Sequence, residues 1–259
     1  MITLAITSQK GGVGKTTVAI NLAHAFARSG RKTLLVDSDP QGSVGLSLTR
    51  QSRHLTGFYD FLTDRSLRAE SLIVPTRLET LSLVASGHSS AYELGGGVMG
   101  ASLHRVRSFL KESKDLGFDI CIVDTAAGLF GSTADILSSS TGVLVPQQAE
   151  PLGVRSVPKI LEALARMRVE NPGLQVLGVV MTMVQQHLAE SREAVDALRS
   201  ILPLEMVMRT IIPRDDLFIR ASAKGLPAGV MDEGAGALAV FDGLRAELEA
   251  KLNFDLYRG

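Results

Sequence analysis

The fold of this chain is decided by the stretch Gln9-Lys10-Gly11-Gly12-Val13-Gly14-Lys15-Thr16-Thr17. It follows an apolar run, residues 2–6, that predicts a buried strand, and it precedes residues 18–27, whose apolar positions repeat with a helical period. A strand, a glycine-rich loop, Lys-Thr and a helix in this order indicate a phosphate-binding loop. Glycines let successive backbone N–H groups point at an anion, and the start of the helix adds unpaired donors.

The side chains of the loop fit the same chemistry. Lys15 can reach the terminal phosphates of a nucleotide, and the Thr16 hydroxyl can coordinate Mg²⁺. The usual pattern has a glycine five residues before the last glycine of the loop; Gln9 stands there instead, and Lys10 adds a second lysine. We expect the nucleotide to contact Gly11, Gly12, Val13, Gly14, Lys15, Thr16 and Thr17.

Composition narrows the class of protein. The chain has 259 residues, enough for one large α/β core. Lys and Arg together number 27, as do Asp and Glu, so any nucleic-acid contact requires a local basic patch. Cys121 is the single cysteine, which excludes disulfides and a multi-cysteine iron–sulfur cluster within the chain. The first strand begins almost at residue 1 and no apolar run reaches membrane-spanning length, so we expect a cytoplasmic protein.

Short apolar runs alternate with amphipathic helical stretches, which is typical of a parallel sheet covered on both faces. The predicted strands are Leu4–Thr7, Thr33–Val36, Leu81–Ala85, Asp119–Val123, Gly142–Pro146, Val176–Met181 and Val207–Ile211. The predicted helices are Thr16–Arg28, Ser102–Ser113, Thr133–Ser138, Arg155–Arg168, Ala189–Ile201, Asp215–Ala223 and Ala237–Lys251. The expected fold class is α/β: a single doubly wound domain over residues 1–259, with a mostly parallel sheet, helices on both faces and a phosphate loop. Residues 86–100 form the least regular segment.

Acidic residues follow two of the predicted strands. Asp37 and Asp39 stand where the second strand ends, and Asp124 directly follows the strand at 119–123. Ligands bind at the carboxyl ends of strands in open α/β sheets, so these carboxylates are expected beside the phosphate loop. Asp124 is then placed to hold Mg²⁺ directly or through water.

The form Lys-Gly-Gly-Val-Gly-Lys-Thr-Thr at residues 10–17 resembles the deviant phosphate loop of ParA- and MinD-type ATPases. The resemblance implies ATP and Mg²⁺ as cofactors, and implies that Lys10 reaches across a homodimer to the partner's nucleotide. The run Asp-Ser-Asp-Pro-Gln-Gly at 37–42 resembles the first switch of ParA proteins. It implies that Asp39 orients the attacking water and belongs to the magnesium shell, with Asp37 in a supporting role. The implied catalytic residues are Lys10, Lys15 and Asp39, and the implied metal residues are Thr16, Asp39 and Asp124.

The later motifs resemble ParA proteins in some segments and MinD proteins in another. Ala126 stands where ParA and MinD proteins have a proline, and the following Ala127-Gly128 is closer to MinD. Residues 145–151 resemble the Pro-x-Gln-x-Glu segment of ParA proteins. Residues 211–214 and 223–227 resemble the nucleotide-proximal stretch of ParA, which implies nucleotide contacts from Pro213 and Arg214. The resemblance covers residues 2 to about 227 and matches a small form without an N-terminal helix-turn-helix.

Basic residues of the C-terminal half are candidates for DNA binding. In ParA proteins the ATP-bound dimer binds DNA through this region, which makes Arg192, Arg199 and Arg220 the first candidates and Arg155 and Lys159 the second. Arg155, Lys159 and Arg166 share one predicted helical face, and Arg192 and Arg199 share another. Acidic neighbours on the same helices favour the alternative, a solvated surface.

The resemblance implies an ATPase that dimerises with ATP, binds DNA non-specifically and uses hydrolysis to partition or position a cargo. A ParB-like protein or cargo adaptor would stimulate hydrolysis, and the ATP-bound form would associate with the nucleoid. A MinD-like, membrane-associated regulator is the alternative, although Glu247 and Glu249 interrupt the C-terminal segment and no membrane binding is expected. A metabolic ligase on this fold is a third possibility, for which the sequence shows no substrate pocket.

Overall fold

The computed structural model describes residues 1–44, 55–88, 100–252 and 254. The predicted irregular segment 86–100 therefore lies mostly outside the described residues, as does the end of the C-terminal tail.

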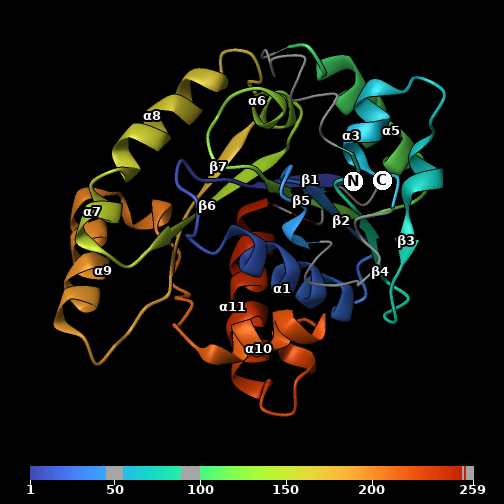
Figure 1. Cartoon of the computed structure of the whole chain (residues 1–259). Helices are drawn as coiled ribbons and strands as arrows, with labels where there is room; N and C mark the ends of the chain where they lie inside the picture. The colour runs from blue at the N-terminus through green and yellow to red at the C-terminus, as the bar shows by residue number, and fades with distance from the viewer. Residues whose placement is uncertain (45–54, 89–99, 253, 255–259) are drawn as a thin grey trace.

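Within the described residues, seven strands form one sheet in the order β3-β4-β2-β5-β1-β6-β7 (Figure 1). The strands are β1 Ile2–Ile6, β2 Thr33–Ser38, β3 Val74–Pro75, β4 Leu81–Val84, β5 Ile120–Thr125, β6 Gly142–Gln148 and β7 Gln175–Thr182. Every neighbouring pair is parallel except β3 and β4. The prediction of a mostly parallel α/β sheet is confirmed. The short edge strand β3 was not predicted from the sequence.

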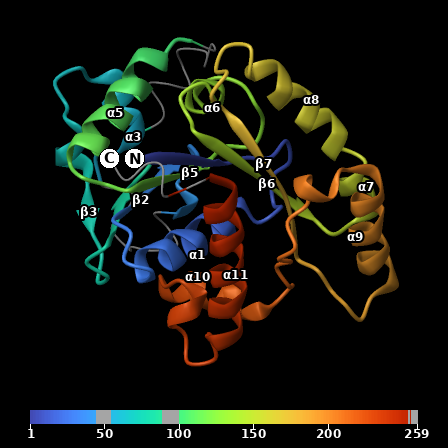
Figure 2. The same cartoon turned by 180° about the vertical axis from the view of Figure 1, so that it is seen from behind.

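Helices cover both faces of this sheet, and each face has its own apolar core. Helices α1 (Lys15–Arg28) and α11 (Ala235–Leu252) pack with Leu4 on one side of β1, whereas Ala5 faces the other side. Figures 1 and 2 show α1, α10 and α11 on one face, with α6 and α8 on the opposite one. The other helices in the described part of the chain are α3 Phe58–Thr63, α5 Leu103–Asp115, α6 Ser132–Leu137, α7 Pro151–Val154, α8 Val157–Met167, α9 Ala189–Ile201 and α10 Asp216–Lys224. Short 3-10 turns are η2 Ala69–Leu72, η3 Leu204–Met206 and η4 Ala228–Val230.

The predicted helix Arg155–Arg168 corresponds to α8, Val157–Met167, and a separate short helix, α7, precedes it and ends at Val154. Pro158 lies in the first turn of α8. Proline has no N–H for the bond to residue i−4, and its ring clashes with that carbonyl, so a continuous helix through 154–158 is disfavoured. Arg155 therefore ends α7 and does not belong to the helix that carries Lys159.

The predicted strand Val207–Ile211 is wrong. Met208 N donates to Val179 O and Ile212 N to Met181 O, so four residues of this segment span only two of β7. A regular parallel ladder cannot form with that mismatch. The N–H groups of Arg209 and Thr210 donate instead to the carboxylate of Glu247 on α11, at 2.8 and 2.7 Å.

The parallel arrangement brings the functional motifs to one edge. Strands β1, β2 and β5 are adjacent and parallel, and Asp37 pairs in register with Asp124. The phosphate loop follows β1 at the same edge, so residues from three separate motifs meet there.

Candidate functional site

The phosphate loop joins β1 to α1 through a backbone that requires glycine. Gly12 has φ +75° and Gly14 has φ +90°, both in the left-handed region that side chains disfavour. Gly14 is the N-cap of α1, and within the described residues no side chain caps the helix and no acidic residue occupies its first turn. The first N–H groups of α1 therefore remain available to an anion.

Contacts from other strands hold the loop in place. Thr182 Oγ1, at the end of β7, donates to Val13 O at 2.8 Å, and Gly128 N donates to Ser8 O at 2.9 Å. Lys15 is only 7% exposed at the start of α1, whereas Lys10 is exposed. The loop thus has one buried lysine, Lys15, and one exposed lysine, Lys10.

Thr16 and Asp124 form the centre of the candidate metal site. Thr16 Oγ1 donates to Asp124 Oδ2 at 2.6 Å, although the two residues are 108 positions apart. Asp124 is fully buried, and within the part of the chain that the structure describes its other oxygen, Oδ1, has no hydrogen-bond partner. An unpaired buried carboxylate oxygen is costly unless a cation binds it.

The charge on Asp124 depends strongly on its surroundings. Burial is the main factor that raises the pKa of Asp124 to about 8. The negative charges of Asp37 and Asp39 act in the same direction. The Thr16 hydrogen bond and the positive charge of Lys15 oppose them. A divalent cation at this position would favour the ionised carboxylate.

The first acidic run is held by its own backbone. Asp37 is buried, and its two carboxylate oxygens accept from Asp39 N at 3.2 Å and from Val44 N at 3.0 Å. Asp39 is half-buried, and its Oδ1 accepts from Gln41 N at 2.9 Å. Asp37 thus shapes the turn, and Asp39 lies closer to solvent at the mouth of the site.

A cavity of about 510 Å³ lies next to the loop. Apolar side chains of Met183, Ile212 and Phe218 line it together with Gly14 and Thr17 of the loop. Pro213 and Arg214, predicted to contact the nucleotide, also line it. A mostly apolar hollow beside a phosphate loop has the character of a site for a planar base.

These residues fit Mg²⁺ and a nucleotide. Thr16 and Asp124 offer two oxygen donors, but among the described residues no group of three or more His, Cys, Asp or Glu side chains could hold a metal by itself. Magnesium is commonly held by one or two protein oxygens together with phosphate oxygens and water. The cavity and the glycine loop would place a nucleotide to supply those phosphates.

Comparison with known proteins gives the family. A family model described as AAA domain matches residues 1–176. The chromosome partitioning protein ParA of Caulobacter vibrioides is 32% identical over 234 residues, covering 88% of this chain and 86% of the relative. The chain belongs to the ParA family. ParA-family membership confirms the resemblance seen in the phosphate loop and the Asp37–Gly42 run.

Solved structures share the fold of this ParA-family chain. Cobyrinic acid a,c-diamide synthase from Mycobacterium smegmatis, with bound ATP analogue and magnesium, has a TM-score of 0.77 at 27% identity, covering 96% of this chain and 94% of that one. The cell division ATPase MinD of Pyrococcus furiosus has a TM-score of 0.77 at 25% identity, covering 96% and 99%. An ATP analogue and magnesium are thus bound by a solved structure of the same fold, which is consistent with ATP and Mg²⁺, the cofactors that the sequence predicted.

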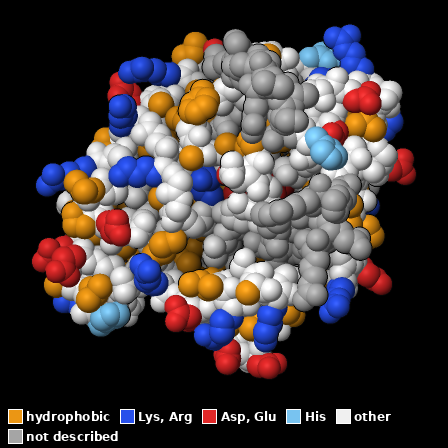
Figure 3. Space-filling view, in the orientation of Figure 1, with side chains coloured by type: hydrophobic (Ala, Val, Ile, Leu, Met, Phe, Trp, Pro, Cys, Tyr) orange, Lys and Arg blue, Asp and Glu red, His pale blue; other side chains and the backbone are white. Residues whose placement is uncertain are grey.

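The structure separates the DNA-binding candidates of this ParA-family chain into groups. Arg192 and Arg199 are exposed on α9, which packs against α7, and Arg155 and Lys159 are exposed nearby on α7 and α8. Arg220 lies on α10, apart from α9 in both views, and pairs with Glu233 at 3.1 Å. Figure 3 shows the basic side chains over α7–α9 interspersed with acidic and apolar ones. In the described part of the chain, no helix is both long and apolar enough to cross a bilayer.

Sequence reasoning missed several residues that support the site. Met183 has φ 52°, unusual for a residue with a side chain, and it lines the cavity. Thr182 supports the loop from β7, and Ser38 Oγ donates to Asp124 O at 2.7 Å. Tyr59 on α3 reaches the same region, although no helix was predicted there. The periodic pattern gave no signal for these residues, because their contacts are with segments distant in sequence.

Proposed function

We propose that this chain is an ATPase that couples nucleotide-dependent dimerisation to non-specific DNA binding, and so partitions or positions a cargo. The observation that carries the proposal is the Thr16–Asp124 pair, with its unpaired buried oxygen, next to Asp39 and the glycine loop. Hydrolysis of ATP needs a positioned water and compensation of phosphate charge more than it needs covalent chemistry, and these groups provide both.

Each residue has a proposed task in hydrolysis. The loop N–H groups and Lys15 bind the phosphates, Pro213 and Arg214 border the base, and Asp39 orients the attacking water. When bound, Mg²⁺ would be held by Thr16 and Asp124, with Asp39 in its surroundings, and would offset charge on the phosphates. We expect slow turnover that a ParB-like protein or cargo adaptor accelerates.

Dimerisation would connect the nucleotide to DNA. Lys10 is exposed, and its proposed role is to contact a nucleotide bound in a second subunit. The chain has no net charge, so a single subunit has little long-range attraction for DNA. Two copies of α9 in one dimer would double the patch formed by Arg192 and Arg199, and the ATP-bound form would then occupy the nucleoid.

The Asp39→Ala variant tests this cycle. It should bind ATP and hydrolyse it on the order of a hundredfold more slowly, because it keeps the phosphate-binding loop and loses the water-positioning group. ATP should then trap it as a dimer in size-exclusion chromatography. An exposed aspartate on α9, Asp196→Ala, is the matched control and should behave as wild type. Normal turnover in Asp39→Ala would contradict its assigned role.

DNA binding is measured on the trapped dimer with two unrelated duplexes at several salt concentrations. With about four to six phosphate contacts, the log–log salt slope should be roughly −4 to −5 and equal for both duplexes. ADP in place of ATP should abolish binding. The MinD-like alternative is favoured by Ala127-Gly128 in the second switch. Sedimentation with anionic liposomes but not with DNA, in the presence of ATP, would support that alternative and overturn the DNA proposal.

A further inference from the structure

A buried tyrosine hydroxyl connects the two chain segments that leave the sheet beside the phosphate loop. Tyr59 Oη donates to Ser38 O at 2.8 Å and lies 3.1 Å from Ser132 Oγ. All three groups are buried. A phenol has one proton, so when Tyr59 donates to the Ser38 carbonyl, the Ser132 hydroxyl is the donor in the second bond.

The two segments carry the groups proposed for hydrolysis. Ser38 directly precedes Asp39, so the orientation of the Ser38 peptide sets where Asp39 begins. Ser38 Oγ also donates to Asp124 O at 2.7 Å. Ser132 is the first residue of α6 and ends the loop that follows Asp124 and Thr125. The Tyr59 hydroxyl therefore adds a link between the two segments beyond the point where the β2–β5 pairing ends at Ser38 and Thr125.

The short helix that carries Tyr59 is anchored at its start. Phe58 N and Tyr59 N donate to the carbonyls of Ala85 and Ser86, at 2.8 and 2.9 Å. A Cβ atom at Gly57 would lie 2.2 Å from Ala85 O, so the backbone approaches the end of β4 as closely as only glycine allows.

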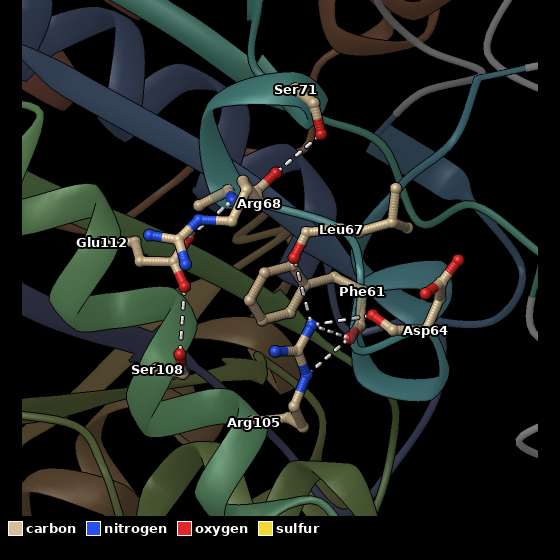
Figure 4. A network of polar contacts seen from close by, with 9 residues as sticks. Phe61, Asp64, Leu67, Arg68, Ser71, Arg105, Ser108 and Glu112 are labelled. Atoms are coloured by element: carbon tan, nitrogen blue, oxygen red, sulfur yellow. Dashed lines mark hydrogen bonds and ion pairs between the residues drawn. The ribbon is translucent and has the colours of Figure 1, made fainter.

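The other end of this helix is held by an arginine from α5 (Figure 4). Arg105 donates to the carbonyl of Phe61 through Nε at 2.8 Å and Nη2 at 2.6 Å, and to the carbonyl of Asp64 at 2.9 Å. Its guanidinium also lies 3.7 Å from the centre of the Phe61 ring. Carbonyl groups at the C-terminal end of a helix have no hydrogen-bond partner within the helix, and Arg105 supplies donors to two of them here. Helix α3, which carries Tyr59, is thus held by hydrogen bonds at both of its ends.

We propose that Tyr59 is a positioning residue for ATP hydrolysis: its hydroxyl locks the Ser38–Asp39 strand end to the start of α6, so that Asp39 and the loop after Asp124 keep their places together. The proposal rests on the proposed ATPase function. It assigns no contact between Tyr59 and the nucleotide. Loss of the hydroxyl should therefore affect turnover more than binding.

The test compares Tyr59→Phe and Ser132→Ala with wild type by steady-state ATPase kinetics, ATP titration and thermal unfolding. Both variants should lower kcat on the order of tenfold, as loss of one buried hydrogen bond predicts, with ATP Kd within about twofold. The double variant should lower kcat no more than the larger single effect, because both remove the same link. Ser140→Ala is the matched control: its buried hydroxyl donates to Ile136 O at 2.7 Å near the far end of α6, and kcat should not change.

Several outcomes overturn the proposal. The first is an unchanged kcat in folded Tyr59→Phe. The second is a fall in kcat that is matched by an equal loss of ATP affinity. The third is a fall in the kcat of Ser140→Ala as large as that in Tyr59→Phe. If Tyr59→Phe does not fold, unchanged kcat in Ser132→Ala decides against it. A wild-type protein that does not hydrolyse ATP contradicts the proposed function as well, whereas equal turnover in wild type and Tyr59→Phe contradicts only the role of Tyr59.

Discussion

The carboxyl edge of the sheet and the outer surface of α7–α9 both carry charged residues that the sequence singled out. The two groups differ in their burial. At the sheet edge, Lys15, Asp37 and Asp124 are buried. On the outer surface, Arg192 and Arg199 are exposed among acidic neighbours. A buried charge is costly unless it is paired or binds a ligand, whereas an exposed charge costs almost nothing. Burial therefore supports a binding role at the edge, and exposure leaves the α9 arginines dependent on experiment.

The largest expected effect is at Lys15. Lys15→Ala should abolish ATP binding, because a lone ammonium near a phosphate contributes about 4 kcal/mol at a surface-like dielectric, or roughly a thousandfold in affinity. Isothermal titration with ATP measures it. The exposed Lys159→Ala on α8 is the control, with unchanged affinity expected. Wild-type affinity in a folded Lys15→Ala protein would remove the basis for the contrast between the two regions.

Lys10 tests whether an exposed lysine at the sheet edge behaves like the buried one. Lys10→Ala should bind ATP as a monomer with little change in affinity at low protein concentration. Its ATP-dependent dimer should be weakened about tenfold or more, as for a central interface residue. Analytical ultracentrifugation with ATP gives both species. Normal dimerisation would show that Lys10 serves only the local loop.

Asp124 makes the buried edge sensitive to pH. Its pKa is raised from the ordinary 3.8 to about 8, so between these values the folded protein binds a proton that the unfolded chain has lost. Stability of the metal-free protein therefore falls as pH rises through this window, by at most about 1.4 kcal/mol per pH unit. Urea unfolding in chelator at pH 6, 7 and 8 should show this slope in wild type relative to Asp124→Asn, which cannot titrate. If the difference in unfolding free energy between wild type and Asp124→Asn does not vary with pH, the raised pKa of Asp124 is contradicted.

The smallest expected effects are on the α9 surface. Arg192→Glu and Arg199→Glu should each weaken DNA binding several-fold on any sequence, and lower the salt slope by about 0.9 for each lost phosphate contact. Arg166→Glu on α8 is the control, because Arg166 already pairs with Glu162 at 2.5 Å. Equal losses in all three variants would indicate a general charge effect and no defined patch.

The sequence predicted most strands of the sheet and the motifs of the candidate site. Each element that was predicted wrongly or missed has a physical explanation. Helix Ala189–Ile201 was predicted to the residue, because apolar positions on one face suffice to define it. Val207–Ile211 is as apolar as a strand, but Glu247, from a helix far along the chain, binds the N–H groups that pairing would use. Helix α3 was missed since its six residues are too few to show a period.

The sequence by itself determined the phosphate loop, because glycine conformation, the helix start and the Lys-Thr pair act over a few neighbouring residues. It also placed Asp39 and Asp124 at strand ends. Only the tertiary structure decided that Thr16 meets Asp124, that Asp124 Oδ1 is left unpaired, and that Tyr59 joins Ser38 to Ser132. Periodicity reports which side chains are buried, but the partner of a buried polar group depends on how distant segments pack.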